Sequence, residues 1–382
     1  MKSALIRLFI SMVLLSGFLP PSLSAQEEPF VRYPEEIETF VRTLHHGKPG
    51  KLAFDHTAAT DINVWRRTAR TKLVELLGLN QMQEDLEGFQ PIIKMGPSRD
   101  VGDHLRTAGT IETEPGLPIP FWLLEPKAKP PSPNGYPLAI CSHGHDTIGR
   151  DTYAGVWHDD KHQRLGISRG GPIAVQAVQH GFVTLVPATR GLAVDASLPD
   201  LKGRHGKRPC RAQLIHALLA GRTAVGERVW DVQRLLDWAL KRPNVDSTRV
   251  MMTGNSGGGV LTVHAAAVDT RITVAVPSCS FTSFTSETGY IFHCDCCLIP
   301  RAGSELGDFS DIGGLISPRP LLAINGVKDG LHHAADVEKA VANVNRIYKT
   351  ADAEGKFNHQ WGQSGHQFYP DLMWPFIEKW SQ

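Results

Sequence analysis

The strongest constraint on the fold of this chain lies at residues 249–260, where a short apolar run leads into a glycine-rich turn and then into a helical segment. The turn, at residues 254–258, reads Gly-Asn-Ser-Gly-Gly. A serine on a sharp turn between a strand and a helix has a strained backbone that tolerates only small neighbours, so glycine is needed two positions before it and two after it. The pattern predicts a strand, a nucleophile elbow and a helix, with Ser256 as the candidate nucleophile.

A Gly-x-Ser-x-Gly sequence alone is a weak sign of catalysis, because it also arises by chance in a chain with 36 glycines. Its surroundings favour catalysis. Downstream, Asp329 follows an apolar strand predicted at 321–325, and His366 follows a short strand predicted at 357–361. An acid and a histidine that each follow a strand of a parallel sheet can complete a catalytic triad with the serine.

Neighbouring residues offer alternatives for both roles. Asp329 precedes a glycine, so it could simply form an Asx-turn. His332 and His333 compete with His366 for the role of general base, but they follow Asp329 too closely to reach the serine easily. His359 also competes, but it falls within a predicted strand. We therefore expect Asp329 to orient His366, and His366 to take the proton from the nucleophile.

The oxyanion hole is expected where two main-chain N–H groups meet. The N–H of Gly257 follows the nucleophile directly and lies at the positive end of the next helix. A buried strand predicted at 137–142 ends in His143-Gly144-His145, and the loop after such a strand supplies the second donor. We assign this donor to the N–H of His145, with Gly144 letting the backbone approach the substrate.

Two side chains close to these loops are candidates for substrate binding, His143 and Arg190. Arg190 comes just after another buried strand, predicted at 181–187. Each has a structural alternative: His143 as an ordinary loop histidine, and Arg190 as a buried arginine that holds neighbouring segments.

Strand and helix patterns alternate along most of the chain. An antiparallel pair is predicted at 107–112 and 119–124, and an amphipathic helix at 222–241 separates two buried strands. This alternation predicts an α/β fold with a mostly parallel, doubly wound sheet flanked by helices. The catalytic domain is expected at 105–382, with an insertion at 278–317 that shapes specificity.

The segment ahead of this domain, residues 26–104, is mostly polar, with apolar residues at helical spacing near Trp65. It predicts an N-terminal helical extension. A second polar segment, 192–220, is rich in Lys, Arg and Gly and is expected to be a loop that borders the mouth of the site.

The expected insertion contains the sequence His-Cys-Asp-Cys-Cys at 293–297. Cysteine and histidine are zinc ligands, but adjacent cysteines without a separate Cys-x-x-Cys pair fit a tetrahedral zinc site poorly. In an exported protein with 6 cysteines, disulfides are the more natural use, with Cys141, Cys210 and Cys279 as possible partners. Cys141 lies within a buried strand and is alternatively a small core residue. We predict no metal and no cofactor.

Residues 1–25 have the features of a secretory signal peptide. Lys2 and Arg7 give a positive end, 8–15 is apolar, and small residues end at Ala25. The apolar stretch is short for a permanent membrane span, although an uncleaved anchor is the alternative. The sequence therefore predicts a secreted or periplasmic protein with no membrane span after cleavage of the signal.

The near-zero net charge of the chain gives no indication of a strongly charged partner. The chain has 382 residues, with 40 basic against 39 acidic side chains and a net charge of +1. Nothing in this balance suggests binding to nucleic acid or to an anionic membrane surface. We expect a local pocket for a small-molecule or polysaccharide ester, while the oligomeric state stays open.

Several of these motifs together resemble one branch of the α/β hydrolases, the bacterial acetyl xylan esterases and dienelactone hydrolase-like proteins. The segments that carry the resemblance are 245–250, 254–259, 318–320, 326–329, Arg190-Gly191 and Gly365-His366. The similarity covers about residues 105–380 and implies a secreted carbohydrate esterase whose triad falls on the residues already chosen. Two positions differ from the acetyl xylan esterases, which often have glutamine at the place of Gly257 and an aromatic residue at that of His145. Dienelactone hydrolases proper use cysteine in place of Ser256.

Two further functions compete with a serine carboxylic ester hydrolase. The first is a serine peptidase of the prolyl oligopeptidase type, which shares the fold and the triad order. The segment before Arg106 is too short for the propeller of such a peptidase. The second is a non-catalytic binding module, which an intact triad with an open oxyanion hole argues against.

Overall fold

The computed structural model describes residues 34–44, 49–54, 61–146, 148–192 and 208–380. Contacts divide the chain into a unit that ends at Val41 and a unit that begins at Arg42. Helix α1 (Glu35–Arg42) spans this boundary, and the elements below belong to the second unit. The predicted signal peptide, residues 1–25, lies outside the described residues.

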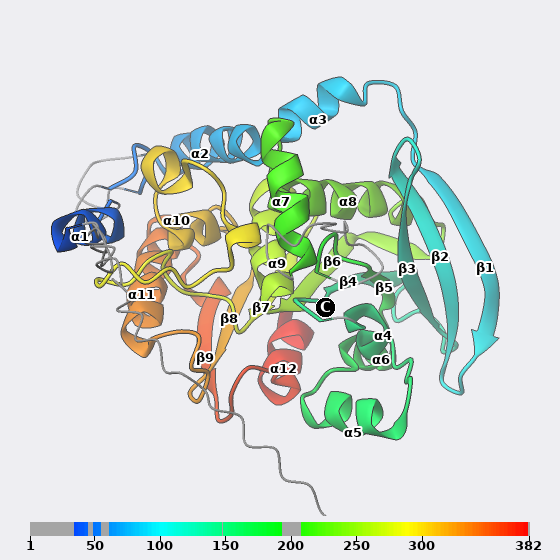
Figure 1. Ribbon diagram of the computed structural model, residues 1–382. Coiled ribbons are helices and arrows are strands. Elements are labelled where there is room, and N and C mark those ends of the chain that lie inside the picture. Colours follow the sequence, from blue (N-terminus) through cyan, green and yellow to red (C-terminus); the bar gives the residue numbers. More distant parts are fainter. Residues whose placement is uncertain (1–33, 45–48, 55–60, 147, 193–207, 381–382) are drawn as a thin grey trace, which may run out of the picture. The chain divides into compact units, whose positions relative to one another are not determined.

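The second unit is built on a nine-stranded sheet with the order β1-β2-β3-β5-β4-β6-β7-β8-β9 (Figure 1). Strands β4 to β9 pair with one another in parallel, whereas the pairs β1–β2, β2–β3 and β3–β5 are antiparallel. The bounds are β1 (Ile92–Asp100), β2 (His104–Glu114), β3 (Leu117–Pro126), β4 (Tyr136–Ser142), β5 (Val183–Pro187), β6 (Val245–Asn255), β7 (Val274–Ser278), β8 (Leu321–Gly326) and β9 (Phe357–Gly362).

Helices cover both faces of this sheet and bury two apolar cores (Figure 1). One core includes α6 (Ile173–Gln179) and α12 (Pro370–Trp380). The other includes α8 (Ala224–Ala239), α9 (Gly257–Val268) and α11 (Ala334–Thr350). Because both faces are covered, strands β5, β7 and β8 are buried along their whole length. The predicted doubly wound sheet is confirmed.

The region ahead of the sheet is only partly the helical extension that the sequence predicts. Helix α2 (Ile62–Leu77) begins at Asp61, whose side chain accepts a hydrogen bond of 2.7 Å from the N–H of Asn63. It ends at Gly78, which has a φ of 80°. The apolar residues at helical spacing near Trp65, from which the helix was predicted, are among its buried residues. Helix α3 (Leu79–Asp85) follows.

Residues 92–100 correct the prediction, because they form strand β1 rather than part of a helical extension. β1 lies at the edge of the sheet, and most of its side chains are exposed. Its register against β2 shifts between Met95 and Ser98. An exposed edge strand with such an irregularity lacks the alternation of apolar and polar residues by which strands are found in a sequence.

Short helices occupy the connections. The polar segment 192–220 is not all loop, because residues 209–219 form α7 (Pro209–Leu219), while 193–207 lie outside the described residues. Between β7 and β8 come η2 (Asp295–Cys297), η3 (Ala302–Leu306) and α10 (Phe309–Gly314). The remaining helices are α4 (Gly149–Tyr153), α5 (Asp160–Ser168) and η4 (Glu354–Lys356).

One buried histidine in α9 makes the stability of the fold depend on pH. The side chain of His264 is fully buried, and its Nδ1 donates a hydrogen bond of 2.8 Å to the carbonyl of Val260. Burial lowers the pKa of His264 to about 4. An unfolded histidine has a pKa of about 6.5 and one unit corresponds to about 1.4 kcal/mol, so this group stabilises the fold by roughly 3 kcal/mol at most.

We expect this contribution to be fully present above about pH 6.5 and to be lost as the pH falls toward about 4, because only the unfolded chain takes up the proton in that interval. Urea unfolding at several pH values measures it. The H264Q variant should show a shallower loss of unfolding free energy on acidification than the wild type, whereas H216Q, at an exposed position of α7, should follow the wild type. Equal slopes for H264Q and wild type would refute the assignment.

Candidate active site

Ser256 stands on the turn between β6 and α9 with φ 58° and ψ −124°. This conformation is strained for a residue with a side chain. The glycines around it allow close packing: a Cβ on Gly254 would lie 2.5 Å from the carbonyl oxygen of Ser142, and a Cβ on Gly258 would lie 1.9 Å from the same oxygen. The N–H of Ser256 donates to the carbonyl of Ser278 on β7. The turn thus has the geometry of the predicted elbow.

Asp329 and His366 lie together after the last two strands of the sheet. The distance from His366 Nδ1 to Asp329 Oδ2 is 2.7 Å, and Asp329 also accepts a hydrogen bond from the N–H of Leu331. Burial alone would raise the pKa of Asp329, but the hydrogen bond and the charge of His366 outweigh it and hold this pKa below its ordinary value. Asp329 is therefore ionised at neutral pH and can orient the ring.

The competing histidines are placed differently. His332 Nδ1 is 3.9 Å from Asp329, and burial, with repulsion from His293, lowers the pKa of His332 to about 4. His359 lies within β9, where its Nε2 is 3.2 Å from the side-chain oxygen of Asn325, and burial lowers its pKa to about 4 as well. Neither makes the short contact to Asp329 that His366 makes.

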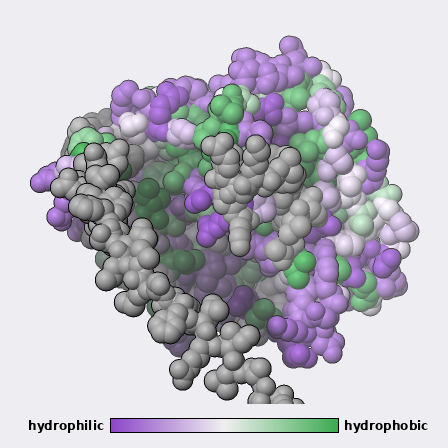
Figure 2. All heavy atoms as spheres, viewed as in Figure 1, coloured by the Kyte–Doolittle hydropathy of each residue, from purple (hydrophilic) through white to green (hydrophobic). Residues whose placement is uncertain are grey.

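A cavity of about 600 Å³ opens over the elbow. Ser256, Gly257, His145 and His366 all line it, and Asp329 lies behind His366. Figure 2 shows the molecule in the orientation of Figure 1, with mostly hydrophilic side chains over α2 and α3 and a mixture of hydrophilic and hydrophobic ones over the edge strands. In the part of the chain that is described, the fold brings most of the predicted site residues to one place.

The loop after β4 packs directly against the elbow. A Cβ on Gly144 would lie 3.0 Å from the Cβ of Ser256 and 2.7 Å from the carbonyl oxygen of Asn255. A Cβ on Gly257 would lie 3.4 Å from Nδ1 of His145. Both expected oxyanion donors therefore belong to segments that meet at the nucleophile, and glycine is needed for this approach.

The structure does not support a role in substrate binding for Arg190 or His143. Arg190 is buried among carboxylates, with contacts of 2.6 Å to Asp231 and 2.7 Å to Glu114. Burial would lower the pKa of Arg190, but Asp231 and the other carboxylates raise it above its ordinary value. His143 is fully buried, and its Nε2 accepts a hydrogen bond of 2.9 Å from the N–H of Thr189. Neither side chain is among those that line the cavity, so the structure favours the structural alternative for each of them.

Cys279 is a residue of the site that the sequence did not point out. It follows β7 with φ 47°, and its sulfur lies within 4.8 Å of the nearest ring nitrogen of His366 and carboxylate oxygen of Asp329. The thiol donates to the carbonyl of Gln367 at 3.3 Å, and burial raises its pKa to about 11. The thiol is therefore protonated at neutral pH and is a poor nucleophile. Its only sequence signal is its place after a buried strand.

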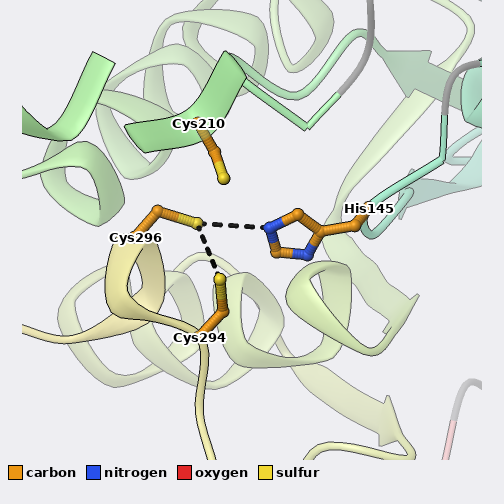
Figure 3. Close-up of side chains that lie close together, drawn as sticks. All are labelled: His145, Cys210, Cys294 and Cys296. Carbon is orange, nitrogen blue, oxygen red and sulfur yellow. Dashed lines mark hydrogen bonds between the residues drawn. The ribbon is translucent and has the colours of Figure 1, made fainter. Parts of the chain in front are cut away.

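The six cysteines are all free, contrary to the expectation of disulfides. Cys141 and Cys279 are buried in and beside the sheet, away from the other four. Cys210, Cys294 and Cys296 instead gather around the ring of His145 (Figure 3), and Cys210, Cys294 and His145 also line the cavity. Among the described residues, this cluster and the group of Cys279, Asp329 and His366 have the donor atoms to hold a metal ion.

Comparisons with known proteins concern the family and the fold. Residues 165–286 match the model of the acetyl xylan esterase family (AXE1). A curated relative from Bacillus subtilis (strain 168), described as a hydrolase and named YtaP, is 29% identical over 157 residues. The match covers 39% of this chain and 50% of YtaP, so the chain spans about half the length of that relative.

Solved structures share the fold over most of the chain. An acetyl xylan esterase from Bacteroides fragilis NCTC 9343 has a TM-score of 0.68 at 14% identity, with 92% of this chain and 97% of that chain covered. A glucuronoyl esterase from Solibacter usitatus has a TM-score of 0.61 at 15% identity, with 87% and 96% covered. At these identities the likeness establishes the fold. In the described part of the chain, no helix has the length and apolar character to cross a membrane.

The sheet order, the helices on both faces and the match at 165–286 lead to one assignment. The chain has the α/β-hydrolase fold, and its residues 165–286 are similar to the acetyl xylan esterase family.

Proposed function

We propose that the protein is an exported serine carboxylic ester hydrolase that removes acyl groups from carbohydrate esters through an acyl-enzyme. The observation that carries the proposal is the contact of 2.7 Å between His366 and Asp329 at a cavity that Ser256 also lines. An ionised acid, a histidine and a serine on a strained elbow form the arrangement that serine hydrolases share.

The proton transfers follow from this contact. Because Nδ1 of His366 donates to Asp329, Nε2 of the same ring is left without a proton and can accept one from the hydroxyl of Ser256. The serine oxygen then attacks the ester carbonyl, and the protonated ring returns its proton to the leaving alcohol. Water, activated by the same ring, hydrolyses the acyl-enzyme. The negative charge of Asp329 stabilises the imidazolium in both steps.

The charge that develops on the carbonyl oxygen needs donors that are already in place. The N–H groups of Gly257 and His145 fill this role in the proposal, with Gly257 at the start of α9. The close approach of Gly144 to Ser256 supports it, because a larger residue would separate the two donors.

A carbohydrate ester is the proposed substrate because the family match and the structural relatives carry such activities in their names. Tyr290, Ile291 and Phe292 line the same cavity and offer apolar and aromatic surface against which a sugar ring can pack. Export rests on the signal-like sequence at residues 1–25. A peptidase with a propeller has no support in the residues ahead of β2 that the structure describes, which hold helices and one edge strand.

The first test is replacement of the nucleophile. We expect S256A to lose turnover of p-nitrophenyl acetate by on the order of 10⁴-fold or more, because the residual reaction lacks an acyl-enzyme. Steady-state kinetics on purified protein measure this, with S280A as a matched control, since Ser280 lines the same cavity but lies outside the elbow. Substantial turnover by S256A, or an equal loss in S280A, would exclude Ser256 as the nucleophile.

The second test concerns the acid. D329N keeps the shape of the side chain but removes the charge that fixes the tautomer of His366, so we expect kcat to fall by roughly 10³- to 10⁴-fold. D146N is the control, because Asp146 lines the cavity and has no contact to His366 among the described residues. A D329N enzyme with near-normal kcat would remove Asp329 from the mechanism.

The third test concerns the substrate. Release of acetate from acetylated xylan and of alcohol from glucuronic acid esters, measured beside p-nitrophenyl acetate, separates the carbohydrate hypothesis from a general esterase. We expect kcat/KM for acetylated xylan or its oligosaccharides to exceed that for the small ester. Activity on the small ester alone would keep the serine mechanism and refute the carbohydrate substrate.

A further inference from the structure

Four donor atoms converge beside the cavity, which three of their residues, His145, Cys210 and Cys294, also line. A ring nitrogen of His145 and the sulfurs of Cys210, Cys294 and Cys296 all lie within 4.8 Å of one another. They come from three separate segments: the loop after β4, the first turn of α7, and the segment at η2. Figure 3 shows the ring and the three sulfurs pointing toward a common centre.

The spacing of these atoms matches the geometry of a tetrahedral metal site. Cys296 Sγ is 3.8 Å from Cys294 Sγ and 3.3 Å from His145 Nε2. With Zn–S bonds of about 2.3 Å and Zn–N bonds of about 2.0 Å, a tetrahedral ion holds two sulfurs about 3.8 Å apart and a sulfur and a nitrogen about 3.5 Å apart. A disulfide would need about 2.05 Å between sulfurs. The observed distances fit a shared ion rather than a covalent bond.

We propose that His145, Cys210, Cys294 and Cys296 bind one zinc ion. Thiolate sulfur together with imidazole nitrogen is the donor set that selects zinc among the common divalent metals. Four protein ligands complete a tetrahedron and leave no position for water, so the site is structural rather than catalytic. The proposal departs from the prediction of no metal, which rested on spacing along the sequence.

The charged residues around the cluster are those expected beside a zinc–thiolate centre with a net negative charge. Three thiolates, a neutral imidazole and Zn²⁺ carry a net charge of about −1. The guanidinium of Arg228, only 2% exposed, donates to the carbonyl of Cys296 at 2.9 Å and contacts the sulfur of Cys297 at 4.0 Å. Its other partners among the described residues are the carbonyl of Arg190 and the amide oxygen of Gln213, neither of them charged.

A buried cation without a carboxylate partner is costly unless another anion lies near it. A zinc-thiolate centre would supply that anion for Arg228. On the opposite, exposed side, Nη1 of Arg208 donates to the sulfur of Cys294 at 3.5 Å, a contact of the kind that stabilises metal-bound thiolates.

The cluster shares one residue, His145, with the candidate active site. His145 is the residue to which the second oxyanion donor is assigned, and zinc on its Nε2 would place the ring proton on Nδ1, next to Gly257. The metal would thus fasten the oxyanion loop to α7 and to the insertion. This consequence for catalysis rests on the proposed function, whereas the metal site itself does not.

Metal content tests the site directly. The full chain is reduced without oxygen, dialysed against zinc sulfate, desalted and analysed by plasma mass spectrometry. We expect about one zinc ion per chain, with C210S and C294S lowering the zinc affinity at least about 100-fold in competition with a chelator. C297A is the matched control, because Cys297 is a buried neighbour of Cys296 that lies outside the four-residue set.

Each outcome decides the proposal. One zinc that is lost in C210S and C294S but kept in C297A, with circular dichroism showing all variants folded, supports the site. Absence of zinc from the reduced wild type, or equal zinc in wild type and C210S, overturns it. Replacement of zinc by cobalt adds a second readout, since a sulfur-rich tetrahedral site gives an intense ligand-field spectrum and an octahedral oxygen site does not.

Esterase assays on the same samples separate this proposal from the proposed function. If zinc removal lowers kcat more than tenfold while C297A stays near wild type, the metal supports the oxyanion loop. Zinc bound by a protein without esterase activity would leave the site intact and refute the function. Full activity in a protein that binds no zinc would refute the site and leave the function intact.

Discussion

The structure depends on the close packing of one tight turn against one loop. At the end of β6 the chain reverses into α9 with so little space that a Cβ on Gly258 would lie 1.9 Å from the carbonyl oxygen of Ser142 on β4. A side chain at this glycine, or at Gly254, would push β4 and α9 apart. The same contact strains the backbone of Ser256 and brings Gly144 against it. The packing of β4 against α9 and the geometry of the turn at Ser256 therefore both require glycine at these positions.

The rest of the sheet brings distant residues to this turn. Parallel strands end at the same edge, so Asp329 after β8 and His366 after β9 lie beside each other although 37 residues separate them. Burial of Asp329 against the His366 ring fixes the orientation of that ring. The two cores on either side of the sheet hold the strand ends in place, which is what a constellation of catalytic groups requires.

Much of this arrangement was predictable from the sequence because it follows from local patterns. Gly254 and Ser256 mark the elbow, and apolar runs with turn residues mark the strands that precede Asp329 and His366. Strand β1 was not predictable, because an exposed edge strand carries little apolar periodicity. The ion pairs of Arg190 were not predictable either, because a sequence does not reveal that Glu114 and Asp231 surround it in the fold.

The cluster of His145, Cys210, Cys294 and Cys296 was also not predictable from the sequence. A zinc site can be recognised in a sequence when it contains two pairs of closely spaced ligands. Here only one such pair exists, Cys294 and Cys296. Cys210 and His145 join them through folding, from α7 and from the loop after β4. A donor set assembled from three segments leaves no spacing pattern, and only the structure brings it together.

The central claim is that Ser256 is the nucleophile of a hydrolase. Incubation with a fluorophosphonate, followed by intact mass measurement and peptide mapping, tests it most directly, because the reagent reacts only with a serine that a neighbouring base activates. If Ser256 is the nucleophile, one adduct per chain forms, and it lies on Ser256. No adduct, or an adduct on another residue, would contradict it.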